Sequence, residues 1–549
     1  MIRSTMSPAI RSVCAAALAA CAFATAAEAQ LALDWRDGRL GSEISHVLQG
    51  GANQIVVLLP SGNAGPTPLA LVDPLDVRFF EVGLDLLAYL TIVPLDVTGA
   101  GGVTFNLPPN PALAGVRLHW HAVALGSTFP APPVFGALSN ATRHTLLLPG
   151  QSELTAEPLQ GPRRYHTANE IPGGPLGASL VFMAGGESPI APFGVRQDWE
   201  VVDPSNEEVV QGGPLLERRT RHTAVTLLNG RVLIVGGIGG GATSVLASAE
   251  LYLPNLDVVQ PTTPMAVPRV GHTATRLADG RVLVVGGLSD SYTVDHPLGY
   301  PEAFLGSGLG TPPLFAPFAE LFDPATSTWT SIPSIGPRTG HEAVLLGDGT
   351  VLIAGGLVPG PLVIPVATNT CLRFDPSTLV ATGAAPLPTA RAFIGMSPAL
   401  GGDALLAGGG PISVGGTQVT VGAVGQPTLR FDRVTGTWNT VTADPTASAL
   451  VVVRCVRMPD GSIRYVLIEN PDVRIDLGVV GSAAPKVFVL VPGAATWVFD
   501  GSLLERRYGF TVTSLDDRTR FLIGGSAANA IPGGTGAIDR TLEAYPYPL

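Results

Sequence analysis

The sequence predicts an all-β fold in which one unit of roughly 50 residues recurs through most of the chain. Three observations support this prediction. Gly and Pro are abundant, with 67 and 50 of the 549 residues. Short runs rich in Val, Ile and Leu lie between turn-forming residues. A pattern of Arg, His, a turn pair and Gly-Gly recurs with constant spacing. These features are typical of strands joined by tight turns.

The repeat is clearest in the stretches RTRHTAVTLLNGRVLIVGG, PRVGHTATRLADGRVLVVGG and PRTGHEAVLLGDGTVLIAGG. The interval between the His and the first Gly is 14 residues in each: His222 to Gly236, His272 to Gly286 and His341 to Gly355. Asn-Gly or Asp-Gly between apolar strands favours a tight hairpin, because Gly accepts a positive φ. Gly-Gly at a strand end lets two backbones approach closely.

Weaker copies bring the number of units to seven. They contain Arg163, Arg391, Val453 and Arg507; the copy at Val453 keeps the interval and an Asp-Gly turn but lacks Gly-Gly. In the second half of the unit an aromatic or apolar residue usually precedes Asp-Pro or lies two residues before a Pro, and three copies have a Trp seven residues later. One four-stranded unit cannot bury both of its faces, so we expect seven units to pack radially.

These motifs resemble the kelch family: a strand, an Asp-Gly turn, a strand with Gly-Gly, a variable loop, an E-x-[YF]-D-P strand and a Trp strand. The resemblance implies a seven-bladed kelch-type β-propeller over residues 151–549. The last unit has no fourth strand after Pro546. SELTAEPLQGPRRYH aligns with STWTSIPSIGPRTGH, so we expect residues 152–158 to supply that strand and close the ring.

Residues 1–29 have the pattern of a signal peptide. Arg3 and Arg11 precede an Ala-rich apolar stretch, and an Ala-x-Ala cleavage site ends at Ala29. The expected protein is therefore secreted or periplasmic and begins at Gln30. The alternative is a lipoprotein anchored at Cys21, because Leu-Ala-Ala precedes that cysteine. No later segment has the ~20 apolar residues of a transmembrane helix.

Residues 30–150 lack the repeat and predict a small β-sandwich-like domain. Strand-like runs cover residues 55–59, 86–93, 116–125 and 145–148. Strand alternation places Arg117, His119 and His121 on one face. We favour a solvent-facing strand there, and a metal held by the two histidines is the alternative.

Composition narrows the functional classes. The net charge of −11 argues against nucleic acid as a partner. The sequence contains no G-x-S-x-G, H-E-x-x-H or P-loop motif. We interpret Cys371 and Cys455 as small buried residues. The repeated histidines are expected to hydrogen-bond locally rather than bind metal, and the repeated arginines to form salt bridges to neighbouring blades rather than bind an anion.

We therefore expect a non-enzymatic binding protein of a bacterial envelope or the extracellular space, with no cofactor and no metal. Its partner would be a protein or glycan on the loop face; the sequence does not define an oligomeric state. The alternative is a carbohydrate-active enzyme. The resemblance extends to secreted galactose oxidase-like copper enzymes, which use Tyr and His ligands and a Tyr cross-linked to Cys, and to sialic acid mutarotase-like proteins.

The expected binding surface is a long insertion after the third Gly-Gly, residues 288–320. Loops between the second and third strands share a ring face with the links that carry the repeated arginines. Long irregular loops in compact domains are typical of functional segments. The candidate ligand-binding residues combine the insertion with its two adjoining links: Tyr292, Asp295, His296, Tyr300, Arg269 and Arg338.

Overall fold

The computed structural model describes residues 31–546, with gaps at 38–39, 128, 132, 148–152, 155–162, 164, 174–178, 189–193, 205–207, 241–244, 290–313, 361–364, 416–417, 422–425, 444–450, 458–460, 470–485, 503–506, 515–519 and 528–542. Across these ranges the chain forms strands and short 3-10 helices without an α-helix, which confirms an all-β fold. No helix of the described ranges is long and apolar enough to cross a membrane. The expected signal peptide lies outside them.

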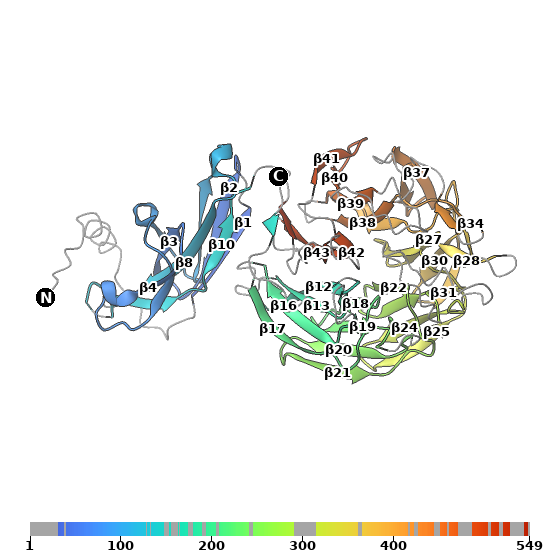
Figure 1. Cartoon of the computed structure of the whole chain (residues 1–549), viewed down its shortest axis with the longest axis horizontal. Helices are drawn as coiled ribbons and strands as arrows, with labels where there is room; N and C mark the ends of the chain where they lie inside the picture. The colour runs from blue at the N-terminus through green and yellow to red at the C-terminus, as the bar shows by residue number, and fades with distance from the viewer. Residues whose placement is uncertain are drawn as a thin grey trace.

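The N-terminal part contains two main sheets and a hairpin, drawn in blue in Figure 1. The first sheet has the order β1 (Ala32–Asp37), β2 (Glu43–Gln49), β7 (Ala100–Asn106). The second has the order β10 (Thr142–Thr145), β8 (Arg117–Leu125), β3 (Ile55–Ser61), β6 (Thr91–Pro94), with β9 (Phe135–Leu138) also paired to β8. The hairpin is β4 (Ala64–Pro68) with β5 (Phe79–Val82).

One core joins the two main sheets. Leu33 and Leu48 of the first sheet pack with Val56, Leu58 and Trp120 of the second, and all five are buried. Their apolar faces therefore meet as in a sandwich. The predicted strand over residues 86–93 is only partly present, because a 3-10 helix, η2 (Leu87–Tyr89), precedes β6.

The rest of the chain forms seven four-stranded sheets among its described residues, which we number 1 to 7. Sheet 1 is β12 (Thr167–Pro172), β13 (Ser179–Ala184), β16 (Asp198–Asp203), β17 (Glu208–Pro214). Sheet 2 is β18 (Thr223–Thr226), β19 (Val232–Val235), β20 (Ala249–Leu253), β21 (Val258–Thr262). Sheet 3 is β22 (Thr273–Arg276), β23 (Val282–Val285), β24 (Ala319–Asp323), β25 (Thr328–Ile332).

Sheets 4 to 7 follow the same order. Sheet 4 is β26 (Glu342–Leu345), β27 (Val351–Ala354), β30 (Cys371–Asp375), β31 (Val380–Ala384). Sheet 5 is β32 (Gly395–Pro398), β33 (Ala404–Ala407), β36 (Thr428–Asp432), β37 (Thr437–Thr442). Sheet 6 is β38 (Val451–Arg457), β39 (Ile463–Glu469), β40 (Lys486–Leu490), β41 (Val498–Ser502). Sheet 7 is β42 (Arg507–Ser514), β43 (Arg520–Ala527), β44 (Glu543–Pro546), β11 (Glu153–Leu154).

Small two-stranded sheets extend the loops between the second and third strands of three sheets. They are β14 (Glu187–Ser188) with β15 (Gly194–Val195), β28 (Leu357–Pro359) with β29 (Pro365–Ala367), and β34 (Ile412–Gly415) with β35 (Gln418–Val421). The other short 3-10 helices are η1 (Leu69–Leu71), η3 (Pro111–Leu113) and η7 (Leu400–Gly402).

The first strands of the seven sheets lie next to one another around a common centre (Figure 1). Each contacts the first strand of the following sheet, and β42 of sheet 7 contacts β12 of sheet 1. Apolar side chains fill the space between sheets: Leu283 and Leu321 of sheet 3 pack with Ile353 and Phe374 of sheet 4. Sheets 2 to 5 are each thereby packed between two others.

Sheet 7 is built from both ends of this region of the chain. Glu153 and Leu154 of β11 pair antiparallel with Ala544 and Glu543 of β44. The outermost strand of sheet 7 therefore comes from residues about 390 positions earlier (544 − 153 = 391). A closure of this kind joins the two edges of a ring without leaving an unpaired strand.

The Gly-Gly pairs lie where adjacent sheets approach most closely. Gly286 has a φ of +64°, and a Cβ placed on it would lie 2.2 Å from the carbonyl oxygen of Arg338 in the next link. The following glycine, Gly287, has a φ of +89° and donates its N–H to the same carbonyl. Both the backbone conformation and the close approach therefore require glycine here.

We expect Gly286→Ala to destabilise the protein by more than Gly349→Ala. Both positions have a positive φ, +64° and +84°, so both substitutions strain the backbone. Only Gly286 also faces a carbonyl; a Cβ on Gly349 would meet no atom within 4 Å. Thermal melting of both variants measures the difference. Equal melting temperatures would show that the sheets do not approach as closely as described.

Candidate functional site

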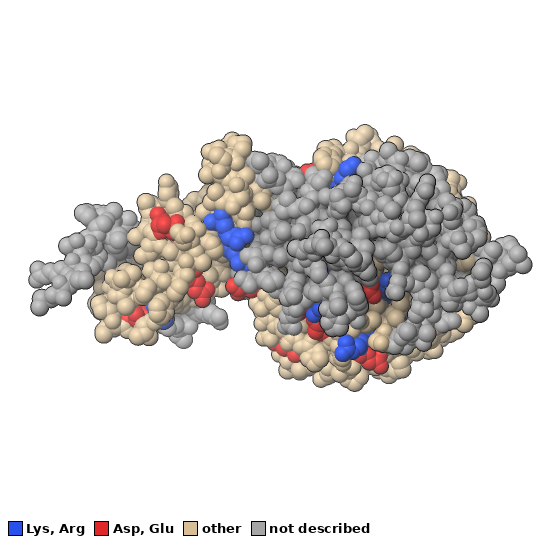
Figure 2. All heavy atoms as spheres, in the orientation of Figure 1, with Lys and Arg blue, Asp and Glu red and all other residues tan. Residues whose placement is uncertain are grey.

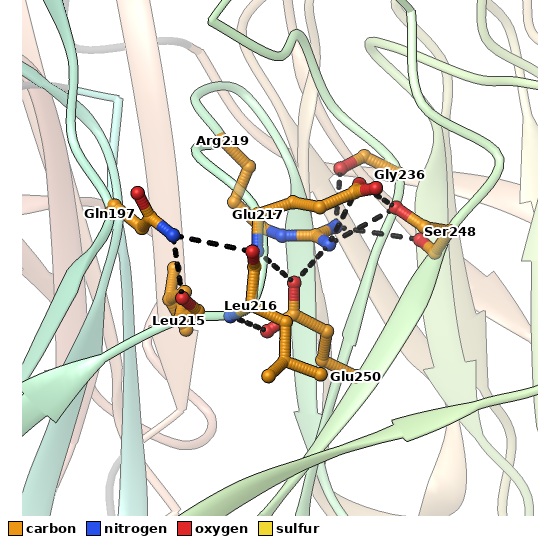
Figure 3. Close-up of polar contacts among 8 residues, drawn as sticks. All are labelled: Gln197, Leu215, Leu216, Glu217, Arg219, Gly236, Ser248 and Glu250. Atoms are coloured by element: carbon orange, nitrogen blue, oxygen red, sulfur yellow. Dashed lines mark hydrogen bonds and ion pairs between the residues drawn. The ribbon is translucent and has the colours of Figure 1, made fainter.

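The repeated arginines bind buried glutamates. In sheet 2, Nη2 of Arg219 lies 2.6 Å from Oε1 of Glu250, and Nη1 donates to the carbonyl of Gly236 at 2.9 Å (Figure 3). The same carboxylate accepts backbone N–H groups of Leu216 at 2.9 Å and Glu217 at 3.0 Å. The guanidinium is fully buried, and its positive charge is paired with the buried carboxylate of Glu250. We call this arrangement the Arg–Glu lock.

The lock recurs in sheets 1 and 3. Arg163 pairs with Glu200, and Nη2 of Arg269 lies 2.9 Å from Oε1 of Glu320. The predicted salt bridges are therefore confirmed for three arginines. The predicted partner was wrong, because each glutamate belongs to the sheet that the arginine leads into and not to a neighbouring one. The neighbouring sheet is bound through the backbone instead: the carbonyl of Arg269 accepts the N–H of Gly237.

Sheets 4 and 5 have no glutamate at this register. Glu320 pairs across strands with Val284, two residues before Gly-Gly; Leu372 of sheet 4 pairs with Ile353 in the same way. Leu429 holds the equivalent position in sheet 5. The arginines that lead into these sheets, Arg338 and Arg391, are nevertheless buried, with exposed fractions of 5% and 0%. Two adjacent sheets therefore keep the cation of the lock and lose its carboxylate.

Arg338 and Arg391 have different surroundings. Within the described residues the guanidinium of Arg338 has one hydrogen bond, from Nη1 to the carbonyl of Gly355 at 3.3 Å. Arg391 donates to the carbonyl of Pro427 at 2.9 Å and, from Nε, to Oγ1 of Thr389 at 3.3 Å. Uncharged acceptors therefore take the place of a carboxylate at Arg391. Arg338 has one such acceptor among the described residues, the carbonyl of Gly355.

Cys371 lies near Arg338 but does not neutralise it. Burial raises the pKa of the Cys371 thiol above its usual value, although the guanidinium of Arg338 acts in the opposite direction. The thiol therefore stays uncharged at neutral pH. Burial also lowers the pKa of Arg338 from its usual value. The prediction that Cys371 is a buried small residue is confirmed, because its exposed fraction is 3%.

The repeated histidines bridge neighbouring sheets. The Nε2 atoms of His222, His272 and His341 lie 2.9–3.0 Å from hydroxyls of Thr167, Thr223 and Thr273 in the preceding sheets. Local hydrogen bonding of these side chains is confirmed. Burial lowers the pKa of His272 to about 3, so its imidazole is neutral and fixed to one partner.

The buried histidines predict a loss of stability in acid. The pKa of His272 is about 3 in the folded protein, against the usual value of 6.5 for a free imidazole. Below pH 6.5 the unfolded chain binds a proton at His272 that the folded protein does not bind. The free energy of unfolding is therefore unaffected by this group above pH 6.5 and falls by about 1.4 kcal/mol per pH unit as the pH drops towards 3. We expect the unfolding free energy of His272→Gln to fall less steeply over this range. Urea unfolding across the range measures both slopes, and parallel slopes would contradict the assignment.

In the N-terminal sheet, His119 and His121 differ in burial. The prediction of a solvent-facing strand was wrong for His121, because the hairpin strand β5 and the segment after β9 cover that side. Nδ1 of His121 accepts the N–H of Glu81 at 3.0 Å, and Nε2 lies 2.8 Å from the carbonyl of Ser139. Both ring nitrogens of His121 are thus engaged by the backbone, whereas His119 is half-buried.

The long insertion begins on the same face as the arginine links. Leu288 pairs with Val270 in one link and with Phe315 at the far end of the insertion. Tyr292, Asp295, His296 and Tyr300 lie outside the described residues. Of the two predicted arginines, Arg269 is fully buried in its lock with Glu320 and offers no free charge to a ligand. Only Arg338 remains as a described candidate from that set.

Charged side chains are sparse and of both signs on the described surface that Figure 2 shows. Among the described residues no three of His, Cys, Asp and Glu gather in a group that holds a metal. The residues that sequence reasoning missed are the lock glutamates and their replacement, Leu372. The E-x-[YF]-D-P motif already contained the signal, because its Glu is present in some copies and absent in others.

The comparisons with known proteins agree on the fold. No family model and no curated protein sequence matches the chain. Among solved structures, a fungal alcohol oxidase of the AA5 family, in complex with copper, matches with a TM-score of 0.51 and 15% identity, covering 73% of this chain and 76% of its own. YjhT matches with a TM-score of 0.41 and 15% identity, covering 62% and 98%. The likeness to the alcohol oxidase supports a fold of the kelch, galactose oxidase-like class for this chain.

The prediction of a non-enzymatic binding protein is corrected by this comparison. The structure of an alcohol oxidase is similar in fold to this chain, and this finding favours the alternative, an enzyme on a propeller, over the prediction of a binding protein. The described residues do not fit a copper centre: His222, His272 and His341 bind threonines between sheets, and Cys371 is enclosed by the core of sheets 4 and 5. We therefore derive no step through copper.

Proposed function

We propose that this chain is a carbohydrate-active enzyme carried on a seven-bladed kelch β-propeller. In this proposal residues 151–549 form the propeller, β11 closes it, residues 30–150 form a separate sandwich-like domain, and residues 1–29 direct export. Seven four-stranded sheets with contacting first strands support the blade number. The likeness to an alcohol oxidase supports an enzyme on this scaffold.

The proposed location of the site rests on one observation. The Arg–Glu lock is kept in sheets 1 to 3 and loses its carboxylate in sheets 4 and 5. Departures from a rule that a scaffold otherwise keeps are expected at functional positions. We therefore place the site on the loop face of sheets 4 and 5, next to the long insertion of sheet 3.

The reaction that we propose is interconversion of sugar anomers, as in mutarotase-like proteins. Ring opening and closure of an aldose moves protons between oxygens, and positioned acid and base groups accelerate such steps typically 10²–10⁴-fold. This chemistry involves neither net oxidation nor group transfer. The protein therefore needs only a site that binds the sugar and carries polar side chains. Loops on one face of the propeller can supply such a site.

Saturation-transfer NMR between α and β anomers tests the proposal directly. We expect the purified protein to raise the exchange rate of at least one aldose or acidic sugar above that of the same protein after heat unfolding. An oxygen electrode run in parallel with the same sugars, with and without added copper, measures oxidation. Anomer exchange and oxygen uptake both equal to the unfolded control would reject an enzyme of this class.

A further inference from the structure

We propose that the loop face of sheet 4 contains a binding slot for a small carboxylate ligand, held by the guanidinium of Arg338 and the backbone N–H of Gly336. The ligand carboxylate takes the place that the Glu320 side chain occupies in sheet 3. The slot is defined by binding alone and does not depend on which reaction the protein catalyses.

The first step is the missing carboxylate. Glu320 in sheet 3 binds the guanidinium of Arg269 at 2.9 Å and accepts the N–H of Ala266 at 2.8 Å. In sheet 4 Leu372 lies at the register of Glu320. Counted from the buried residue that begins each link, Met265 or Ile335, the next residue is Ala266 in sheet 3 and Gly336 in sheet 4. The link to Arg338 is one residue shorter than the link to Arg269. The cation and the first N–H donor are therefore present, while the acceptor between them is replaced by an apolar side chain.

The second step is space. A Cβ placed on Gly336 would meet no atom within 4 Å, so the volume beside this residue is open. Arg338 has an exposed fraction of 5%, whereas Arg219 and Arg269 have 0%. Arg338 is therefore slightly less enclosed than the arginines of the intact locks, whereas Arg391, which also lacks a glutamate, has an exposed fraction of 0%.

The third step is the number of donors. Val267 of sheet 3 supplies a second N–H to Glu320 at 3.3 Å. The second residue after Met265 is Val267, and the second residue after Ile335 in sheet 4 is Pro337, which has no N–H. The remaining donors are one backbone N–H and the guanidinium, which match the two oxygens of one carboxylate. No described residue accepts a hydrogen bond from the N–H of Gly336.

In sheet 5 groups of the protein itself surround the equivalent arginine, Arg391. There Pro388 replaces the residue aligned with Gly336, so its N–H is absent. The carbonyl of Pro427 and the hydroxyl of Thr389 accept hydrogen bonds from Arg391, and Gln426 binds that hydroxyl at 2.8 Å. The protein therefore supplies acceptors of its own to Nε and Nη1 of Arg391, whereas Arg338 has the carbonyl of Gly355 alone among the described residues.

The test uses sodium lactate as the probe and sodium chloride at equal ionic strength as its reference. We expect lactate, but not chloride, to raise the melting temperature of the full chain in a saturable way, since a ligand that binds only the folded state stabilises it. Leu372→Glu supplies an internal carboxylate. We expect this variant to weaken lactate binding by about tenfold or more, measured by calorimetric titration.

Leu429→Glu is the matched control, because it makes the same change at the same register of sheet 5 and should leave lactate binding unchanged. Arg338→Met, a second variant, removes the cation and should abolish lactate binding even if Leu372→Glu fails to fold. The proposal is overturned if lactate stabilises no more than chloride does. It is equally overturned if lactate binds the folded Leu372→Glu or Arg338→Met variant as tightly as it binds the original chain.

Discussion

Replacing Glu250 by Leu is expected to lower the free energy of unfolding by about 3–5 kcal/mol, since it leaves the buried guanidinium of Arg219 without its carboxylate. Arg219 is fully buried and Glu250 is 2% exposed, so water cannot replace the lost partner. The backbone N–H groups of Leu216 and Glu217 lose their acceptor in the same substitution. Chemical denaturation, followed by tryptophan fluorescence, measures the effect.

Two further variants separate charge from packing. Glu217→Ala removes a carboxylate that is 49% exposed and 3.8 Å from Arg219, and we expect it to cost less than about 1 kcal/mol. Combining Glu250→Leu with Arg219→Met removes both charges and should recover much of the loss, because an apolar pair has no unpaired charge to bury. A Glu250→Leu variant as stable as Glu217→Ala would show that the lock contributes nothing.

Deleting residues 150–160 is expected to destabilise the propeller far more than deleting residues 31–145. The first deletion removes β11 and exposes the edge of β44 in sheet 7. An unpaired edge loses its hydrogen bonds and promotes aggregation. The second deletion removes sheets whose strands pair only with one another among the described residues.

Thermal melting and light scattering of the two deletion variants measure this difference. The variant without residues 150–160 should melt at a lower temperature and aggregate, while the variant without residues 31–145 should melt close to the full chain. If removal of residues 150–160 leaves melting unchanged, then the pairing of Leu154 with Glu543 does not hold the ring together.

Constant spacing made the strands of the repeat predictable. The interval of 14 residues places a turn and two strands between His272 and Gly286, and the structure has β22 and β23 there. The N-terminal part was less predictable because it has no repeat: β1, β2 and β7 were not expected, and part of the run over 86–93 is a 3-10 helix.

The burial of particular side chains was harder to predict than the strands. Alternation along β8 placed His121 on an exposed face, yet it is 2% exposed because Phe80 and Ser139 cover it. Arg269 and Arg338 looked equivalent in sequence. The motif contains Glu320 and has Leu372 in its place in the next copy, but that these positions face the arginines follows from the strand register, which is a tertiary property.

A crystal structure of the mature protein grown with lactate tests the central claim most directly, namely that a broken Arg–Glu lock opens a ligand site on the loop face. We predict carboxylate oxygens within hydrogen-bond distance of Arg338 and of the N–H of Gly336, in the place equivalent to the Glu320 side chain. A carboxylate from the chain itself bound to Arg338, with the same space filled by protein, would contradict the account.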